Sequence, residues 1–324
     1  MFSYFKKNTP LLSCIAIYLI FPLIDNSLNL GLLTHIKVIA IFTILALGLN
    51  LITGLTGMLN LGIGGFMAIG AYTYSILTAN LYPFQFNFTI SCICAVLFGA
   101  FIAKVISVPI LRLRGDYFAI VTLGLGEIIQ DSLKNLEAIT QGTQGISPTL
   151  QPSDNPLTNY YVYVLAMALI AILSKNLKDS DYGRALKGVK NDEIVMSALG
   201  YRNDIIKSES FILGSAIAAL SGALFASNLN SSGDPGNYDF QVSIIALSSI
   251  ILGGMGSIVG TIFGTFIIVG LNRIVLAEIS NFLVSKELTT SGSFLSTPDN
   301  WKFFVFGLVL VLSMRFNPKG LFKE

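Results

Sequence analysis

Residues 38–103 read VIAIFTILALGLNLITGLTGMLNLGIGGFMAIGAYTYSILTANLYPFQFNFTISCICAVLFGAFIA, which is 66 consecutive residues without a charged side chain. A helix that spans the hydrocarbon core of a bilayer needs about 20 mostly apolar residues. The stretch is therefore long enough for three such helices, and it contains glycines and a proline that can interrupt a helix. It predicts a protein that crosses a membrane several times.

The composition of the whole chain agrees with this interpretation. The 324 residues include 20 Lys and Arg, 18 Asp and Glu and one His, and charged residues make up 12% of the chain. Soluble domains contain about 25% charged residues, so lipid is expected to solvate much of this surface. We predict an all-α, polytopic transmembrane helix bundle that forms a single domain over residues 1–324. No soluble catalytic domain is expected to fit.

The apolar stretches predict about ten spans, some of them broken by glycine. If the N-terminus is cytoplasmic, the inner segments carry 14 Lys and Arg and the outer segments carry 3. Cytoplasmic loops are enriched in these residues, so both termini are expected to be cytoplasmic. The predicted spans are 11–24, 36–53, 66–82, 89–111, 117–133, 157–174, 209–229, 241–253, 257–272 and 301–314.

Two glycine-rich segments interrupt the apolar runs, one in each half of the chain. They read GLTGMLNLGIGGFMAIGAY (54–72) and LGGMGSIVGTIFG (252–264). Irregular backbone at membrane depth is tolerated only where it is buried in protein or lines a wet cavity. The first segment is therefore expected to pack tightly or to form a wall of a translocation path. The second is expected to form a re-entrant turn or a tight hairpin.

A few polar or small residues near these segments are candidates for a translocation path. Glu127 stands out because charged side chains inside a membrane are costly and are usually functional. It could pair with a basic group from another helix, bind a cationic substrate or relay protons. The candidate path residues are Asn50, Asn60, Gly62, Thr122 and Glu127.

The longest polar segment, residues 175–208, carries seven basic and five acidic residues. Its middle predicts a cytoplasmic amphipathic helix that ends at Gly200, a suitable C-cap. Such a helix is expected to dock on the bilayer surface or in the groove of a cytoplasmic partner. Its apolar positions are Ala185, Leu186, Val189, Val195, Ala198 and Leu199.

Within this segment, GRALKGVKNDEIVMSALG (183–200) resembles the cytoplasmic coupling segment of branched-chain amino acid ABC transporter permeases, the high-affinity permease M component. The resemblance implies that this segment contacts an ATPase, with Arg184, Asp192, Glu193, Ala198 and Gly200 in coupling roles. Further blocks match in the same order: LALGLNLITGLTGMLNLG (45–62), GFMAIGAYT (65–73), LRLRGDYFAIVTLGLGEII (111–129), TQGTQGI (140–146), LGGMGSIVGTIFG (252–264) and FNPKGLF (316–322).

The resemblance also implies a set of partners and a location. The chain would be a multi-pass subunit in the bacterial inner (plasma) membrane. Beside the lipid bilayer, its partners would be a second, homologous permease, two ABC ATP-binding subunits and an extracytoplasmic solute-binding protein. No nucleic acid partner is expected. The chain has no glycine loop ending in GK[ST], so ATP would be hydrolysed by the partner subunits, and no cofactor or metal is expected here.

The sequence leaves the transported solute open. The resemblance points to branched-chain amino acids imported by alternating access, while urea or a short amide carried by the same mechanism is an alternative. Many relatives have an aromatic residue or histidine at the position of Ile63, which puts the solute in doubt. Two other classes are an ion-coupled secondary transporter that uses Glu127 and a membrane enzyme or scaffold.

Overall fold

The computed structural model describes residues 2–28, 31–111, 113, 115–147 and 149–275, with 307–308, 311, 315 and 320–322 near the C-terminus. Every regular element in these residues is a helix, which confirms the predicted all-α class. The longer helices are α1 (Phe2–Leu28), α2 (Leu33–Leu49), α3 (Ile63–Thr78), α4 (Phe88–Ile110), α5 (Asp116–Asn135), α7 (Pro156–Asp179), α10 (Asn203–Leu229), α11 (Phe240–Gly253) and α12 (Ile258–Gly270).

Short helical segments connect or extend these helices. A π-helix, η1 (Asn50–Gly54), continues α2, and a second, η4 (Leu271–Val275), continues α12. The others are α6 (Glu137–Thr140), α8 (Asp181–Asn191), α9 (Glu193–Ala198) and the 3₁₀ turns η2 (Gly142–Gln144) and η3 (Pro235–Tyr238).

Nine of the predicted spans coincide with helices, including 117–133, which lies within α5. The tenth, 301–314, lies outside the described residues apart from a few single positions. Among the described residues, five stretches are long and apolar enough to cross a membrane: Leu33–Gly54, Phe88–Ile110, Pro156–Asp179, Asn203–Leu229 and Ile258–Val275. By contrast, α3 has 16 residues and α11 has 14, fewer than the about 20 that a full crossing needs.

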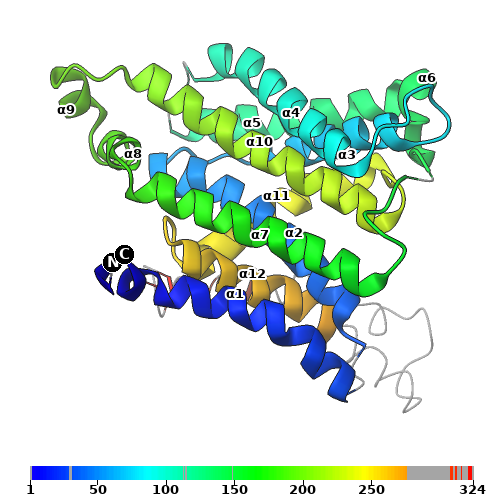
Figure 1. The fold of residues 1–324 in the computed structure, drawn as a ribbon. Coiled ribbons are helices and arrows are strands. Elements are labelled where there is room, and N and C mark those ends of the chain that lie inside the picture. The colour runs from blue at the N-terminus through cyan, green and yellow to red at the C-terminus, as the bar shows by residue number, and fades with distance from the viewer. Residues whose placement is uncertain are drawn as a thin grey trace.

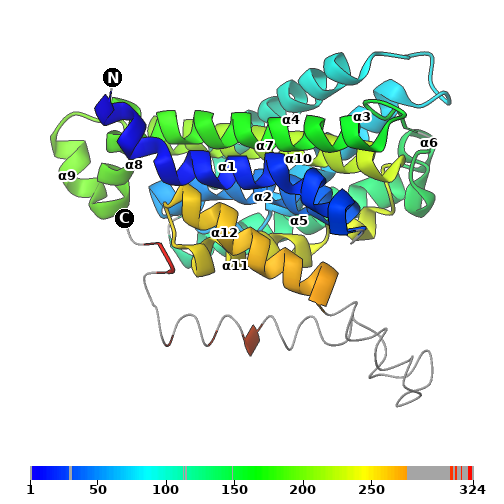
Figure 2. The ribbon, with the colours of Figure 1, turned by 60° about the horizontal axis from the view of Figure 1, so that its bottom comes forward.

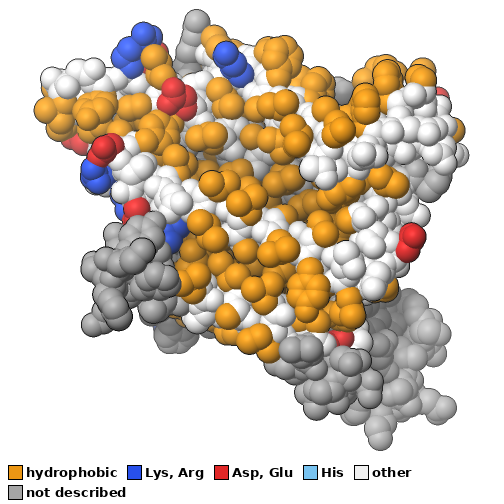
Figure 3. Space-filling model, in the orientation of Figure 1, with side chains coloured by type: hydrophobic (Ala, Val, Ile, Leu, Met, Phe, Trp, Pro, Cys, Tyr) orange, Lys and Arg blue, Asp and Glu red, His pale blue; other side chains and the backbone are white. Residues whose placement is uncertain are grey.

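The long helices lie side by side (Figures 1 and 2), with α8 and α9 at one end of the bundle and α6 at the other. We call the first the α8–α9 end. Figure 3 shows a flank of the bundle covered mainly by hydrophobic side chains, with most of the visible Lys, Arg, Asp and Glu toward the α8–α9 end. This distribution fits a body solvated by lipid and an end solvated by water.

Helix α10 packs at the centre of the bundle through small residues. A β-carbon at Gly222 would overlap the carbonyl oxygen of Met67 in α3, and one at Gly214 would lie 2.6 Å from the carbonyl oxygen of Gly48 in α2. Backbones approach this closely only where side chains are absent or small, which is the usual way that helices associate in lipid. Larger side chains, such as Phe66 and Phe211 at 5.5 Å between ring centroids, fill the space beside these contacts.

The turn between α11 and α12 lies at the α8–α9 end and confirms the predicted hairpin (Figure 2). Gly254 and Gly256 have φ angles of 111° and 90°, values that favour glycine. Residues 320–322 pack against this turn, where the N–H of Leu321 donates to the carbonyl of Leu252 at 3.0 Å. The hairpin is thus held at its tip by residues close to the C-terminus.

Candidate functional site: a broken-helix junction and a coupling segment

The two glycine-rich segments meet inside the bundle. Asn50, in the first turn of η1, accepts a hydrogen bond through Oδ1 from the N–H of Gly256 at 2.8 Å. A β-carbon at Gly54 would collide with the Asn50 amide and would lie 2.7 Å from the nitrogen of Gly256. Because the Asn50 side chain is buried and engaged in this bond, it joins the two halves of the chain in this conformation.

The backbone between η1 and α3 is not helical, and Asn60 organises its last residues. The Oδ1 atom of Asn60 accepts from the N–H of Gly62 at 2.9 Å, directly before α3 begins. Asn60 is 0% exposed, and its Nδ2 amide has no hydrogen-bond partner among the described residues. A buried, unpaired donor of this kind costs about 1–3 kcal/mol, so it marks a place where an acceptor would be favourable.

Helix α5 closes this region from the other side. The Oγ1 atom of Thr122 accepts from the N–H of Leu61 at 3.1 Å, and a β-carbon at Gly62 would overlap the carbonyl oxygen of Thr122. Gly126 lies one turn further along α5, and a β-carbon added there would be 3.3 Å from the Cα of Gly62. Three of the candidate path residues, Asn60, Gly62 and Thr122, therefore lie together.

Glu127 follows Gly126 and is half-buried on α5. Among the described residues, no basic side chain pairs with it. The face of α5 around it is open to the surroundings, with Tyr117 73%, Ile120 66% and Ile128 65% exposed. The face thus combines apolar side chains with a carboxylate that lipid would not accommodate cheaply.

A second half-length helix, α11, begins beside α3; the sequence predicted a span at 241–253 but not this contact. The Oγ atom of Ser243 in α11 accepts from the N–H of Gly64 at 3.0 Å, and Asp239 caps the N-terminus of α11 through the N–H of Gln241 at 2.9 Å. In the preceding η3 turn Pro235 and Tyr238 are buried, and the ring of Tyr238 packs against those of Tyr72 and Phe225. Helix N-termini carry partial positive charge, and those of α3 and α11 lie side by side here, with that of α11 capped by the Asp239 carboxylate.

The one signal in the sequence for this arrangement was the charge-free run 240–272, which is too long for one span. The run predicts a break but does not say that Ser232, Pro235 and Tyr238, just before α11, are buried against the bundle. That placement depends on partners far along the chain, such as Gln130, whose Nε2 donates to the carbonyl of Pro235 at 3.1 Å.

The coupling segment differs from the single amphipathic helix that the sequence predicted, because the chain forms α8 and α9 with a break at Asp192. The Oδ1 atom of Asp192 accepts from the N–H groups of Ile194 and Val195 at 2.8 and 3.1 Å, and Asp192 is therefore the N-cap of a new helix. Gly200 ends α9 with φ of 87°, as expected of a C-cap.

The charged residues predicted to couple to an ATPase make contacts within the chain. Glu193 forms an ion pair with Lys207 at the start of α10, and Arg184 pairs with Asp181 one turn earlier in α8. Ala198 is exposed. Their contact with an ATPase stays a prediction.

The apolar residues of the segment divide into two groups. Leu186, Val189 and Met196 are buried together with Leu51 and Leu55 of the η1 region. The other group is exposed at the α8–α9 end and forms what we call the α9 patch: Ile194 (82% exposed), Leu199 (68%), Val195 (52%) and Tyr201 (49%).

Lys190 connects α8 directly to the broken-helix junction. Its Nζ donates to the carbonyl oxygen of Gly54, the last residue of η1, at 2.7 Å. Burial and, to a smaller extent, the neighbouring Lys187 lower the pKa of the Lys190 ammonium. A polar cavity of about 280 Å³ adjoins this contact, and its charged lining residues are Asp116, Lys190, Glu193 and Lys207. The coupling segment thus has one face on η1 and another, apolar, face that is exposed.

The geometry defines a helical protein with apolar, membrane-length helices, a broken-helix junction and an exposed apolar patch on α9, and comparison with known proteins identifies its class. The chain belongs to the family described as the branched-chain amino acid transport system / permease component, whose model matches residues 31–314. No solved structure matches the chain.

Several characterised relatives are similar to it over most of its length. The high-affinity branched-chain amino acid transport system permease protein LivM of Escherichia coli is 34% identical over 310 residues, which cover 87% of this chain and 67% of LivM. LivM of Salmonella typhimurium has the same identity and coverage. The autoinducer 2 import system permease protein LsrC of Yersinia enterocolitica is 26% identical over 318 residues, covering 94% of this chain and 81% of LsrC.

Proposed function

We propose that this chain is the transmembrane permease subunit of a binding-protein-dependent ABC importer that moves branched-chain amino acids inward by alternating access. The observation that carries the proposal is the 34% identity to LivM over 87% of the chain. Its partners are a homologous second permease, two ATP-binding subunits and an external solute-binding protein. The chain resides in the bacterial inner membrane with about ten spans and with the α8–α9 end and both termini in the cytoplasm.

The α9 patch supports docking of an ATP-binding subunit. Four large apolar side chains exposed side by side on a helix and its C-terminal turn are costly in water and typical of a protein interface. Movement of the docked subunit would reach the membrane through α8, because Leu186 and Val189 pack against the η1 region and Lys190 holds the Gly54 carbonyl. We assign the coupling role to this contact as well as to the predicted residues 183–200.

The junction of η1, α3, α5 and α11 supports a gate on the translocation path. The unpaired Asn60 amide, beside the N-terminus of α3, offers a donor that suits the carboxylate of an amino acid, as helix N-termini do in other transporters. In the present conformation α5 covers this region through Thr122 and Gly126. Opening would require α5 to move away from Gly62, which its largely exposed face permits.

The open face of α5 is proposed to meet the second permease. A face that carries Glu127 and the exposed carboxylate of Asp131 is unsuited to hydrocarbon, whereas a partner permease with a wet path between the subunits would accommodate both. Glu127 then contacts the path, and an ion-coupled mechanism that uses it is the competing function.

Uptake of radiolabelled leucine into proteoliposomes tests the proposal. The vesicles contain the co-expressed permeases and ATP-binding subunits with ATP inside and the binding protein outside, and urea, glutamate and ribose are added as competitors. ATP-dependent leucine uptake that requires the binding protein is the expected result. Uptake of urea alone would replace the solute but keep the mechanism, while uptake without ATP, driven by an ion gradient, would favour the secondary transporter.

A further inference from the structure

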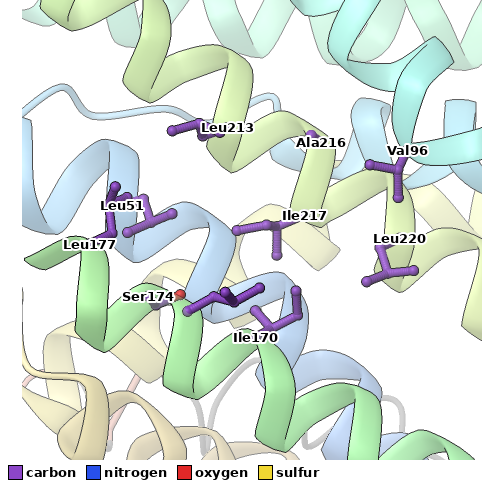
Figure 4. Close-up of a pocket in the computed structure, with 10 residues that line it drawn as sticks. Leu51, Val96, Ile170, Ser174, Leu177, Leu213, Ala216, Ile217 and Leu220 are labelled. Carbon is purple, nitrogen blue, oxygen red and sulfur yellow. The ribbon is translucent and has the colours of Figure 1, made fainter. Parts of the chain in front are cut away.

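An apolar groove runs between α7 and α10, and one residue each of η1 (Leu51) and α4 (Val96) completes its lining (Figure 4). Its volume is about 350 Å³. Nearly all of its lining atoms are aliphatic, and its one hydroxyl, Ser174 Oγ, has no hydrogen-bond partner among the described residues. The lining residues are Leu51, Val96, Ile170, Leu173, Ser174, Leu177, Leu213, Ala216, Ile217 and Leu220.

The surroundings of the groove show what medium it meets. Its lining residues belong to four of the stretches that are long and apolar enough to cross a membrane: Leu33–Gly54, Phe88–Ile110, Pro156–Asp179 and Asn203–Leu229. The same face of the molecule displays exposed Leu97 on α4 and Leu169 on α7, and it is largely hydrophobic in Figure 3. In a membrane this groove therefore opens into acyl chains rather than into water.

Basic side chains stand at the end of the groove nearer α8. Ser107 of α4 and Ser208 of α10 lie at one depth, since their Oγ atoms are 2.9 Å apart. The exposed Lys104 is about one helical turn from Ser107 toward the groove, and Val96 is about two turns further. On α7, Lys175 and Lys178 follow Ser174 and Leu177 directly.

A long apolar slot with ammonium groups at one end matches the shape and charge of a phospholipid. Lysine near the end of a membrane helix extends its charge to the headgroup level, where the phosphate of a lipid accepts from it. Two carboxylates, Asp179 and Glu209, lie at the same end of the bundle, so the headgroup itself need not carry net negative charge.

We infer that the groove binds one phospholipid of the leaflet on the α8–α9 side, with an acyl chain between α7 and α10 and the phosphate at Lys104. The lipid is a resident ligand rather than bulk solvent, because the groove is a cavity between helices and not a smooth surface. Its chain lies against Leu51, Leu177 and Ile217, which also pack on the buried cluster of the coupling segment. The inference needs only that the chain lies in a membrane and not that its solute or ATPase is as proposed.

Native mass spectrometry of the assembly extracted from membranes tests the inference, with groove-filling substitutions and a neighbouring control. Val96→Phe fills the groove from α4, and Ala216→Phe fills it from α10, which guards against one variant failing to fold. Leu97→Phe is the matched control, because Leu97 is the next residue on α4 and is 63% exposed outside the groove. Each protein is then incubated with vesicles of phosphatidylethanolamine alone or with added phosphatidylglycerol.

The expected result is one phospholipid retained by the original chain and by Leu97→Phe and lost from both groove-filling variants. Lys104→Gln is expected to lower retention threefold or more for both headgroups. Equal retention in all variants, no retained lipid in the original chain, or a bound protein in place of lipid would each overturn the inference. Unchanged retention in Lys104→Gln would overturn the phosphate contact.

Discussion

Gly62 and Gly124, at the contact between α3 and α5, differ in how much space surrounds them. Gly62 has no room for a methyl group, because a β-carbon there would overlap the Thr122 carbonyl, whereas Gly124 on α5 has nothing within 4 Å of that position. The density of glycine in residues 54–72 predicted tight packing in general. It could not tell which glycine touches which helix, since that depends on the placement of α5, more than 50 residues away.

Gly62→Ala is expected to destabilise the junction between α3 and α5. Overpacking against backbone costs about 1–3 kcal/mol because the backbone must shift, so the melting temperature of the purified chain should fall and uptake should fall with it. Gly124→Ala should leave both close to those of the original chain. Equal melting temperatures for the two variants would show that Gly62 and Thr122 are not in contact.

Lys190 is a residue whose role the sequence did not indicate. It lies in the coupling segment among other lysines, and its bond to Gly54 spans 136 positions. Lys190→Met keeps the length of the side chain but removes the donor to η1. Since coupling free energies between sites are about 1–3 kcal/mol, leucine uptake per ATP hydrolysed should fall about fivefold or more while hydrolysis continues.

Measurement of uptake and ATPase activity in the same proteoliposomes checks this expectation. Lys134→Met, which removes a half-buried lysine at the α6 end that pairs with Asp131 at 3.5 Å, is the control and should change neither activity. An unchanged ratio of uptake to hydrolysis in Lys190→Met would contradict the coupling role of the Gly54 contact.

At the scale of elements, the sequence predicted the helical structure of the coupling segment but not its break at Asp192. The apolar spacing of residues 185–199 correctly predicted helical structure. It missed the break because Asp192 fits both a helix surface and an N-cap, and only the hydrogen bonds to Ile194 and Val195 decide between them. The break turns α9 so that Val195 and Leu199, expected on the same face as Leu186, are exposed instead.

Leu199→Asp is expected to weaken docking of the ATP-binding subunit without harming the fold of the permease. A buried, unpaired carboxylate in an interface costs several kcal/mol, so the ATP-binding subunit should co-purify at less than about a tenth of its usual level. Ile139→Asp makes the same change at a residue that is 50% exposed at the α6 end. Equal co-purification of the two variants would remove the α9 patch as the docking surface.

For the whole molecule, composition and charge-free runs were enough to predict an all-helical membrane protein and most of its helices. Residues 241–253 were predicted as a span and form α11, but composition does not say whether so short an apolar helix crosses the membrane or stops inside the bundle. The η3 turn before it was not predicted. The candidate site was predicted in part: Asn60, Gly62 and Thr122 lie together, while Ser243 and Lys190 were missed, since their partners are set by tertiary contacts.

The orientation of the bundle can be tested with single cysteines in a chain whose three cysteines have been replaced by serine. Ser153 precedes α7 at the α6 end, and Asp204 lies in the first turn of α10 at the α8–α9 end. A membrane-impermeant maleimide added to intact spheroplasts should label Ser153→Cys, and should label Asp204→Cys only after lysis. The reverse pattern would invert the proposed topology.

The bond between Asn50 and Gly256 has a consequence for biosynthesis. The two residues are 206 positions apart. Because ribosomes add about 5–20 residues per second, Gly256 is synthesised on the order of 10–40 s after Asn50. During that time a nascent chain holds a polar group that only the late hairpin can satisfy. Chains truncated before Gly256 should therefore be short-lived in the cell, because proteases that survey newly inserted segments can act in this interval.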